Sequence, residues 1–277
     1  MISTVDTVAP GPHGDVPVRV YVPGAPVDWT PQLVWVHGGA FSHGGLDQPE
    51  SHAVATALVE HGITVVAVGY RLVPRWNPLR RPAPGVLPGV RFPVPLDDVD
   101  AAFRWAAERG GGRVALGGAS AGACLSAAVA LRRADRGLPG PTRLALAYGT
   151  FHAQLPRASA ALRSRLRGRH GLGQFTPAVV ERMNRSYAGA PSAMADPYAF
   201  PGGHDVRALP ATLLLDADRD ALAASGERFG RELSAQGVSV RRTVLPGTRH
   251  GFLGRPGRPA FDRGVATLAA WLLAGAG

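Results

Sequence analysis

The stretch Arg-Val-Ala-Leu-Gly-Gly-Ala-Ser-Ala-Gly at 113–122 decides the fold of this chain. The apolar segment 113–116 predicts a short strand, and the small residues of 121–134 predict a helix. Ser120 falls in the turn between them, where Gly118 and Gly122 leave room for a tight, strained bend. A serine on such a strand–turn–helix junction is presented at a helix N-terminus, where the helix dipole favours a developing negative charge. The setting predicts a nucleophilic serine.

Two further motifs stand in a fixed order around this turn. His-Gly-Gly-Ala-Phe at 37–41 follows an apolar run at 33–36, and Arg-His-Gly-Phe at 249–252 lies near the end of the sequence. An acidic cluster precedes the second motif. The chain order serine, acid, histidine is that of the α/β-hydrolase triad, whereas chymotrypsin-type and subtilisin-type proteases use other orders. The sequence therefore predicts a serine hydrolase with His250 as the general base.

The acid of the triad has three candidates. Asp216, Asp218 and Asp220 all follow a predicted strand at 211–215, and all three could lie near the top of a sheet. The residues alone leave this choice open. The acid would orient His250 and stabilise the imidazolium.

Backbone N–H groups for a tetrahedral oxyanion are predicted in the 37–41 motif. Gly38, Gly39 and Ala40 form the expected oxyanion hole together with Ala121, the residue after the nucleophile. Within this set Gly39 and Ala40 are the expected donors, and Gly38 shapes the turn. We expect His37 to be a structural hydrogen-bonding residue of the loop.

Strand and helix signals alternate along the chain, which predicts an α/β fold with a mostly parallel, doubly wound sheet. The segment 74–95 contains seven prolines and predicts no regular structure. The segment 151–207 lacks strand signals, and we interpret it as a small helical cap inserted into one domain, 1–277. The expected strands are 16–22, 33–36, 63–68, 113–116, 144–148, 211–215 and 238–244, and the expected helices are 50–60, 97–108, 121–134, 223–236 and 260–273.

Composition excludes several classes of protein. The net charge of +10 comes from arginine alone, because the chain has no lysine. These arginines are scattered, which argues against a nucleic-acid-binding protein. One cluster spans 157–169; we interpret it as a solvated face, with a site for an acidic substrate as the lesser alternative. The single cysteine, Cys124, excludes an intrachain disulfide, and no His/Asp spacing predicts a metal site. Neither a signal peptide nor a membrane-length apolar run is apparent, so we expect a cytoplasmic protein.

The joint motifs resemble the hormone-sensitive-lipase-like family of α/β-hydrolases, also called bacterial esterase family IV. The resemblance covers about 32–275. It implies the α/β-hydrolase fold and hydrolysis of short-chain carboxylic esters through an acyl-enzyme, without cofactor or metal. The family pattern Asp-X-Leu singles out Asp220 as the acid, and a homodimer through 238–273 is plausible by the same resemblance. The motifs are His-Gly-Gly-Ala-Phe at 37–41, Tyr-Arg-Leu-Val-Pro at 70–74, Phe-Pro at 92–93, Asp-Asp at 97–98, Gly-Ala-Ser-Ala-Gly at 118–122, Asp-Pro-Tyr at 196–198, Asp-Ala-Leu at 220–222 and His-Gly-Phe at 250–252.

Three departures from the family pattern bear on the site. Ala119 stands where the family usually has an acidic or hydroxyl residue, and Gly69 replaces an aspartate. Only 36 residues precede the 37–41 motif, which predicts a reduced cap and an open site. Two alternatives stay open. The same triad could act on an amide, formamide, lactone or carbamate, or the fold could serve as a non-catalytic ligand receptor.

Overall fold

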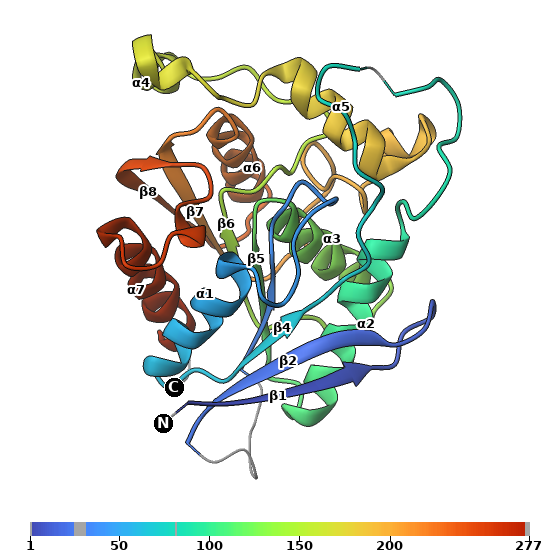
Figure 1. Ribbon diagram of the computed structural model, residues 1–277, viewed down its shortest axis with the longest axis vertical. Helices are drawn as coiled ribbons and strands as arrows, with labels where there is room; N and C mark the ends of the chain where they lie inside the picture. The colour runs from blue at the N-terminus through green and yellow to red at the C-terminus, as the bar shows by residue number, and fades with distance from the viewer. Residues whose placement is uncertain (1, 25–31, 81, 275–277) are drawn as a thin grey trace.

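The structure is a computed structural model, and it describes residues 2–24, 32–80 and 82–274. Within these residues the chain forms an eight-stranded sheet with the order β1-β2-β4-β3-β5-β6-β7-β8 (Figure 1). β1 pairs with β2 and β2 with β4 in antiparallel fashion, and every pair from β4 to β8 is parallel. The strands are β1 (Ile2–Ala9), β2 (Val16–Pro23), β3 (Leu33–Val36), β4 (Val65–Val68), β5 (Ala115–Ala119), β6 (Leu144–Ala147), β7 (Thr212–Arg219) and β8 (Val240–Arg249).

The central strands are apolar on both faces. β3, β4 and β6 read Leu-Val-Trp-Val, Val-Val-Ala-Val and Leu-Ala-Leu-Ala, and every one of these residues is buried. Strands of this kind need a helical layer on each face of the sheet, because both sides of the pleat must be removed from water. The predicted doubly wound α/β fold follows from this pattern and is confirmed.

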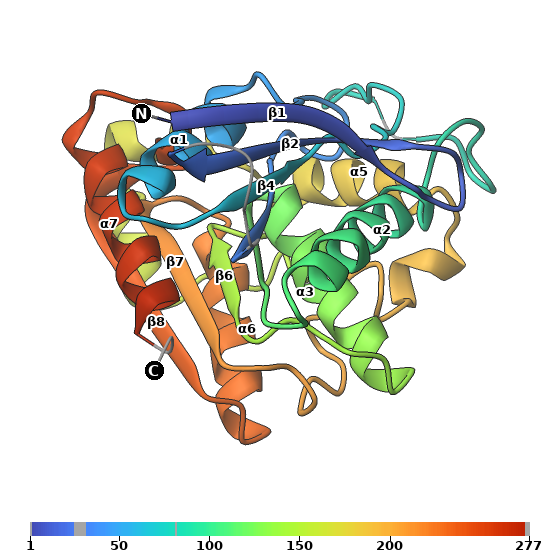
Figure 2. The ribbon, with the colours of Figure 1, turned by 90° about the horizontal axis from the view of Figure 1, so that it is seen from below.

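Two helical layers cover the sheet (Figure 2). α1 (Pro49–Glu60) and α7 (Pro259–Leu273) pack on one face around Trp35. α2 (Val94–Arg109), α3 (Ala121–Asp135) and α6 (Ala223–Ala235) pack on the other face. Each layer buries its own apolar cluster, so the sheet is held from both sides.

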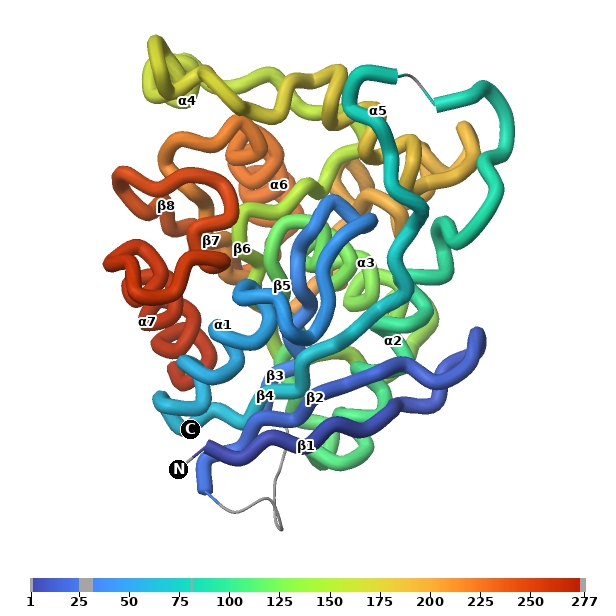
Figure 3. The backbone as a smooth tube through the Cα atoms, in the orientation of Figure 1, coloured from blue at the N-terminus to red at the C-terminus, as the bar shows by residue number. Residues whose placement is uncertain are grey.

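The segment between β6 and β7 contains α4 (Ala160–Arg165) and α5 (Pro177–Ala188), with short 3₁₀ turns at Gly168–Gly171 and Ser192–Ala195. Both helices lie beyond the ends of the central strands (Figure 1). The proline-rich segment runs beside α5 (Figure 3), where the Leu87 N–H donates to the Gly189 carbonyl at 2.8 Å. The Phe92 N–H likewise donates to the Tyr187 carbonyl at 2.9 Å. These bonds join two long segments that the sequence could not place relative to each other.

The structure differs from the sequence-based expectations in several elements. β7 and β8 run to Arg219 and Arg249, beyond the expected ends at 215 and 244. β1 was not predicted, because its alternating, largely exposed residues form a sheet edge and bury little apolar surface. β5 spans Ala115–Ala119 and includes two glycines, whereas the expected strand was 113–116. α2 begins at Val94, so the prediction of no regular structure through 95 is wrong. Pro95 lies in the first helical turn, where a missing N–H costs nothing.

Candidate active site

The turn at Ser120 has the strained backbone that its surroundings predict. Ser120 adopts φ 52° and ψ −114°, a conformation that non-glycine residues rarely occupy. It follows β5 directly and precedes α3. The Ser120 N–H donates to the Ala147 carbonyl at 2.8 Å, and the Ser120 carbonyl accepts from the Ala123 N–H at 3.1 Å. Neighbouring β6 and the first turn of α3 therefore hold the serine in place.

Glycines let the loop after β3 pack against this turn. A Cβ at Gly122 would collide with the carbonyl oxygens of Val36 and His37. A Cβ at Gly118 would lie 2.6 Å from the Val36 carbonyl oxygen, and one at Gly38 would lie 3.1 Å from Cβ of Ser120. The two motifs therefore meet backbone to backbone, with no room for side chains between them.

This packing leads to a stability prediction. Gly122→Ala is expected to lower the free energy of unfolding by about 2–4 kcal/mol, because the new methyl group must displace backbone atoms and cannot simply turn a side chain. Urea unfolding followed by circular dichroism measures the change. The matched control is Gly140→Ala, where no atom lies within 4 Å of the added Cβ. Equal stability of the two variants would contradict the packing argument.

Three side chains from distant segments form one hydrogen-bonded chain. His250 Nε2 lies 3.0 Å from Ser120 Oγ, and His250 Nδ1 lies 2.7 Å from Asp220 Oδ2. Asp220 is fully buried, and its Oδ1 accepts from the Leu222 N–H at 3.0 Å. Because a carboxylate only accepts, Nδ1 carries the proton and Nε2 is free to accept from the serine hydroxyl. This is the tautomer that a general base needs.

The electrostatic surroundings of His250 favour its protonated form. Burial acts to lower the pKa of His250, but the charge and hydrogen bond of Asp220, together with the charge of Glu50, outweigh it. The pKa of His250 therefore lies above its ordinary value of 6.5. Two carboxylates thus stabilise the imidazolium that would form when the base takes a proton.

The other two candidate acids point elsewhere. Asp218 accepts from the Gly247 N–H at 2.9 Å and pairs with Arg165 at 3.1 Å. Asp216 pairs with Arg242 at 2.6 Å, and its burial raises its pKa to about 6 despite that partner. Of the three aspartates, Asp220 is the one whose carboxylate meets His250.

The loop after β3 turns sharply over the serine. Gly39, Ala40 and Phe41 all have positive φ, and the Gly39 carbonyl accepts from the N–H groups of Ser42 at 3.0 Å and His43 at 2.9 Å. Among the described residues, no hydrogen bond uses the N–H of Gly39, Ala40 or Ala121. These three donors are the ones available to a ligand.

Gly38 was expected to shape the turn of the oxyanion hole rather than to donate, and its N–H has a partner within the protein. Its N–H already donates to Glu50 Oε2 at 2.9 Å. His37 is buried with its Nδ1 2.6 Å from the Gly38 carbonyl, and its ring stacks on Tyr70 at 4.5 Å. Burial lowers the pKa of His37 to about 4. It is a neutral structural residue, as expected.

The chain is similar to known proteins over most of its length. The family model described as the alpha/beta hydrolase fold matches residues 85–254, and a second, described as BD-FAE, matches 18–149. Carboxylesterase NlhH of Mycobacterium tuberculosis is 34% identical over 248 residues, which cover 86% of this chain and 72% of that protein. The chain belongs to the hormone-sensitive-lipase-like family of α/β-hydrolases. The family resemblance read from the motifs is confirmed.

Other members of this hormone-sensitive-lipase-like family have similar sequences and folds. Ethyl acetate hydrolase of Pseudomonas putida is 31% identical over 250 residues, covering 86% of this chain and 71% of that protein. The solved esterase of Pyrobaculum calidifontis superposes with a TM-score of 0.80 at 28% identity, covering 98% of this chain and 84% of that one. The similarity therefore extends over the whole sheet and its helical layers.

Several residues beside Ser120, His250 and Asp220 belong to no motif of the sequence. The Tyr148 ring lies edge-on to the His250 ring at 4.9 Å between centroids, and Phe175 lies edge-on to it at 5.1 Å. Gln174 links the segment between β6 and β7 to the residues on either side of Asp220, here called the acid loop. Its Nε2 donates to the Arg219 carbonyl at 3.0 Å, and its Oε1 accepts from the Ala221 N–H at 2.8 Å. Only the fold brings these residues together, so no spacing in the sequence could have indicated them.

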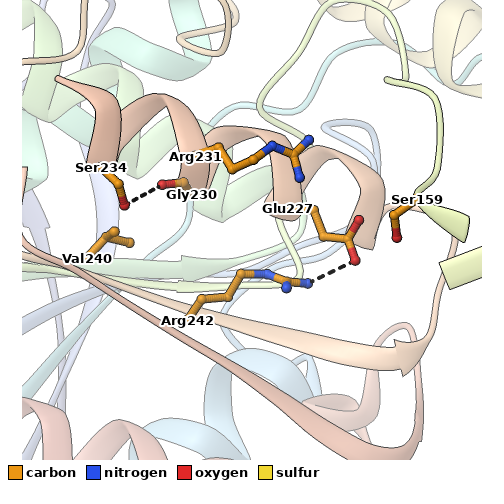
Figure 4. Close-up of a pocket in the computed structure, with 7 residues that line it drawn as sticks. All are labelled: Ser159, Glu227, Gly230, Arg231, Ser234, Val240 and Arg242. Carbon is orange, nitrogen blue, oxygen red and sulfur yellow. Dashed lines mark hydrogen bonds and ion pairs between the residues drawn. The ribbon is translucent and has the colours of Figure 1, made fainter. Parts of the chain in front are cut away.

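A separate pocket lies between α6 and β8 (Figure 4). Arg242 points across it toward Glu227 at 3.7 Å and also pairs with buried Asp216, so its charge is already compensated. The pocket lining includes none of Ser120, Asp220 and His250. Its lining residues are Ser159, Glu227, Gly230, Arg231, Ser234, Val240 and Arg242.

The described residues form neither a metal-binding cluster nor a membrane-spanning helix. Within 2–24, 32–80 and 82–274, no group of three or more His, Cys, Asp or Glu side chains is arranged to hold a metal ion. No helix in the described part of the chain is long and apolar enough to cross a membrane.

Proposed function

We propose that this protein hydrolyses short-chain carboxylic esters through a covalent acyl-enzyme on Ser120. The observation that carries the proposal is the hydrogen-bonded chain from Ser120 Oγ through His250 to Asp220, with distances of 3.0 Å and 2.7 Å. A strained serine, an oriented imidazole and a buried carboxylate are the parts of a nucleophilic triad. Ester hydrolysis as the reaction class agrees with the family to which the chain belongs.

The reaction proceeds in two halves. His250 Nε2 takes the hydroxyl proton of Ser120 as Oγ attacks the ester carbonyl, and the N–H groups of Gly39, Ala40 and Ala121 stabilise the oxyanion. His250 then gives the proton to the leaving alcohol, which departs as the carbonyl re-forms and leaves an acyl-serine. In the second half His250 takes a proton from water, whose oxygen attacks the acyl carbon, and Ser120 recovers its proton as the carboxylic acid leaves. Asp220 keeps the Nδ1 proton in place throughout.

The restriction to short acyl chains rests on the surroundings of Ser120. The serine is only 8% exposed, and Phe175 lies beside the His250 ring. We take 151–207 as a small cap inserted into the domain, because α4 and α5 lie beyond the strand ends and Gln174 ties this segment to the acid loop. The named activity of one relative, ethyl acetate hydrolase, agrees with a small ester.

Hydrolysis of p-nitrophenyl esters from acetate to palmitate tests this function. We expect turnover of acetate and butyrate and little or none of palmitate, with stoichiometric labelling of Ser120 by a fluorophosphonate probe. Labelling without hydrolysis of any ester would contradict the ester assignment and favour the same triad acting on an amide, formamide, lactone or carbamate. Absence of both labelling and turnover would contradict a nucleophilic Ser120 and favour a non-catalytic receptor.

A further inference from the structure

Glu50 is a buried carboxylate beside the proposed catalytic groups. It is 5% exposed and lies in the first turn of α1. Its Oε2 accepts from the Gly38 N–H at 2.9 Å and from Gln48 Nε2 at 3.3 Å, and its Oε1 accepts from the Tyr148 hydroxyl at 2.6 Å. All three partners are donors, which suits an ionised carboxylate, because it can only accept.

An acidic residue in the first turn of a helix ordinarily serves the helix dipole from the surface. Glu50 differs, because its side chain points away from solvent and toward the loop after β3. The backbone of Glu50 is also fixed by a hydrogen bond, because Trp35 Nε1 donates to the Glu50 carbonyl at 2.9 Å. Among the described residues, no arginine or histidine forms an ion pair with Glu50. A buried charge without a cationic partner is costly, so its retention calls for a role beyond helix capping.

The first consequence concerns the loop after β3, which carries the proposed oxyanion donors Gly39 and Ala40 and is here called the oxyanion loop. The Glu50 carboxylate lies so close to Gly38 that a Cβ on that glycine would collide with Oε2. By binding the Gly38 N–H, Glu50 fixes the peptide that precedes Gly39 and Ala40. The free N–H groups of those two residues must point at a developing charge before it forms, since reorientation during the reaction would cost the stabilisation.

The second consequence concerns the base. The Tyr148 hydroxyl bound by Glu50 belongs to the ring that lies edge-on to His250 at 4.9 Å. The groups that face His250 are Asp220, Ser120, Phe175 and Tyr148, with Glu50 acting through its charge. The adjacent Arg249 is directed away from the base, toward the Arg169 carbonyl and His170. Glu50 and Asp220 thus supply negative charge to the imidazole from two different elements of the fold.

We propose that Glu50 is a positioning residue that holds the oxyanion loop through Gly38, supports the His250 ring through Tyr148, and stabilises the imidazolium formed when His250 takes the Ser120 proton. This inference rests on the proposed function of Ser120 and His250. It assigns one carboxylate to two parts of the site, the oxyanion loop and the base His250, which lie far apart in the sequence.

Three substitutions separate the charge of Glu50 from its hydrogen bonds. Glu50→Gln removes the charge and places an amide NH₂ either against the Tyr148 hydroxyl or against the Gly38 and Gln48 donors. Glu50→Asp keeps the charge but draws the carboxylate back from Gly38. Glu60→Gln makes the same chemical change at the exposed end of the same helix and is the control. For each variant we would measure kcat and KM for p-nitrophenyl acetate from pH 5 to 9, the rate of fluorophosphonate labelling over that range, and the Tm.

Glu50→Gln is expected to lower kcat by about 10–100-fold with little change in KM, since positioned oxyanion donors act in the transition state. The acid limb of the pH profile should move to lower pH. Loss of the Glu50 charge lowers the pKa of His250, so the neutral imidazole persists to lower pH. Glu50→Asp should keep the wild-type acid limb with a reduced kcat, and Glu60→Gln should match wild type in every measurement.

Either of two results for Glu50→Gln would overturn the inference. The first is a wild-type kcat with a wild-type acid limb of the pH profile. The second is a reduced kcat with an acid limb that is unmoved in both turnover and labelling, which is the result expected if Glu50 only supports packing. If Glu50→Gln gives no cooperative melting transition, a wild-type kcat in Glu50→Asp overturns it instead. A wild-type protein that hydrolyses no ester contradicts the proposed substrate, whereas the labelling profile still tests Glu50.

Discussion

Ser120→Ala is expected to lower kcat/KM for p-nitrophenyl acetate by about 10⁴–10⁶-fold, because the acyl-enzyme cannot form without the hydroxyl. Residual turnover would come from the oxyanion donors and from substrate binding alone. The Tm should change little, since Ser120 Oγ makes its contact with His250 and the backbone strain of the turn is the same for alanine. Steady-state kinetics on freshly purified protein measure the effect, with active-site titration to exclude traces of wild type.

A matched control lies six residues further on, in the helix α3 that follows Ser120. Ser126 is fully buried, and its hydroxyl donates to the Gly122 carbonyl at 2.8 Å. Ser126→Ala removes a buried hydroxyl near the turn without touching His250, so it should retain most of the activity. Near-normal turnover in Ser120→Ala would rule out the proposed nucleophile. An equally large loss in both serine variants would instead indicate damage to the turn.

Asp220→Asn is expected to lower kcat by about 10⁴-fold, as loss of the orienting carboxylate does in a serine protease triad. The structure indicates why. The Leu222 N–H donates to Oδ1 at 3.0 Å, so an asparagine would keep its oxygen there and turn its NH₂ toward His250 Nδ1. The imidazole would then accept at Nδ1 and carry its proton on Nε2. In that tautomer it cannot take the proton of Ser120.

Asp218→Asn is the control for the acid, because Asp218 lies near the end of β7, two residues before Asp220, but meets Arg165 and Gly247. We expect it to keep the wild-type kcat. Parallel pH–rate profiles on both variants distinguish the two aspartates. Loss of activity in Asp218→Asn with retention in Asp220→Asn would reverse the assignment of the acid.

Local rules account for the elements that could be predicted. The buried strands are continuous apolar runs, and the turn at Ser120 needs small residues within a few positions of one another. The edge strand β1 escaped prediction, because an exposed strand has no strong apolar pattern and is defined by its pairing with β2. Gly38 was expected among the oxyanion-hole residues because it belongs to the right motif. Its N–H is taken by Glu50, a contact that no motif records.

The sequence by itself determined the doubly wound sheet, the strained turn and the order in which a serine, an acid and a histidine follow one another. The sheet and the turn depend on residues close together in the chain. The order of the motifs stays the same whatever the length of the segments between them. The family pattern already pointed to Asp220 among the three aspartates. Only the tertiary structure shows that Asp216 and Asp218 meet other partners, that the Gly38 N–H is bound by Glu50, and that Glu50 and Tyr148 lie at the site. Asp216 and Asp218 lie in β7 and Asp220 follows it directly, and the direction of each carboxylate is set by packing against distant segments. Hydrogen bonds that span up to 130 positions of sequence form only after the sheet has aligned the strand ends from which these side chains project.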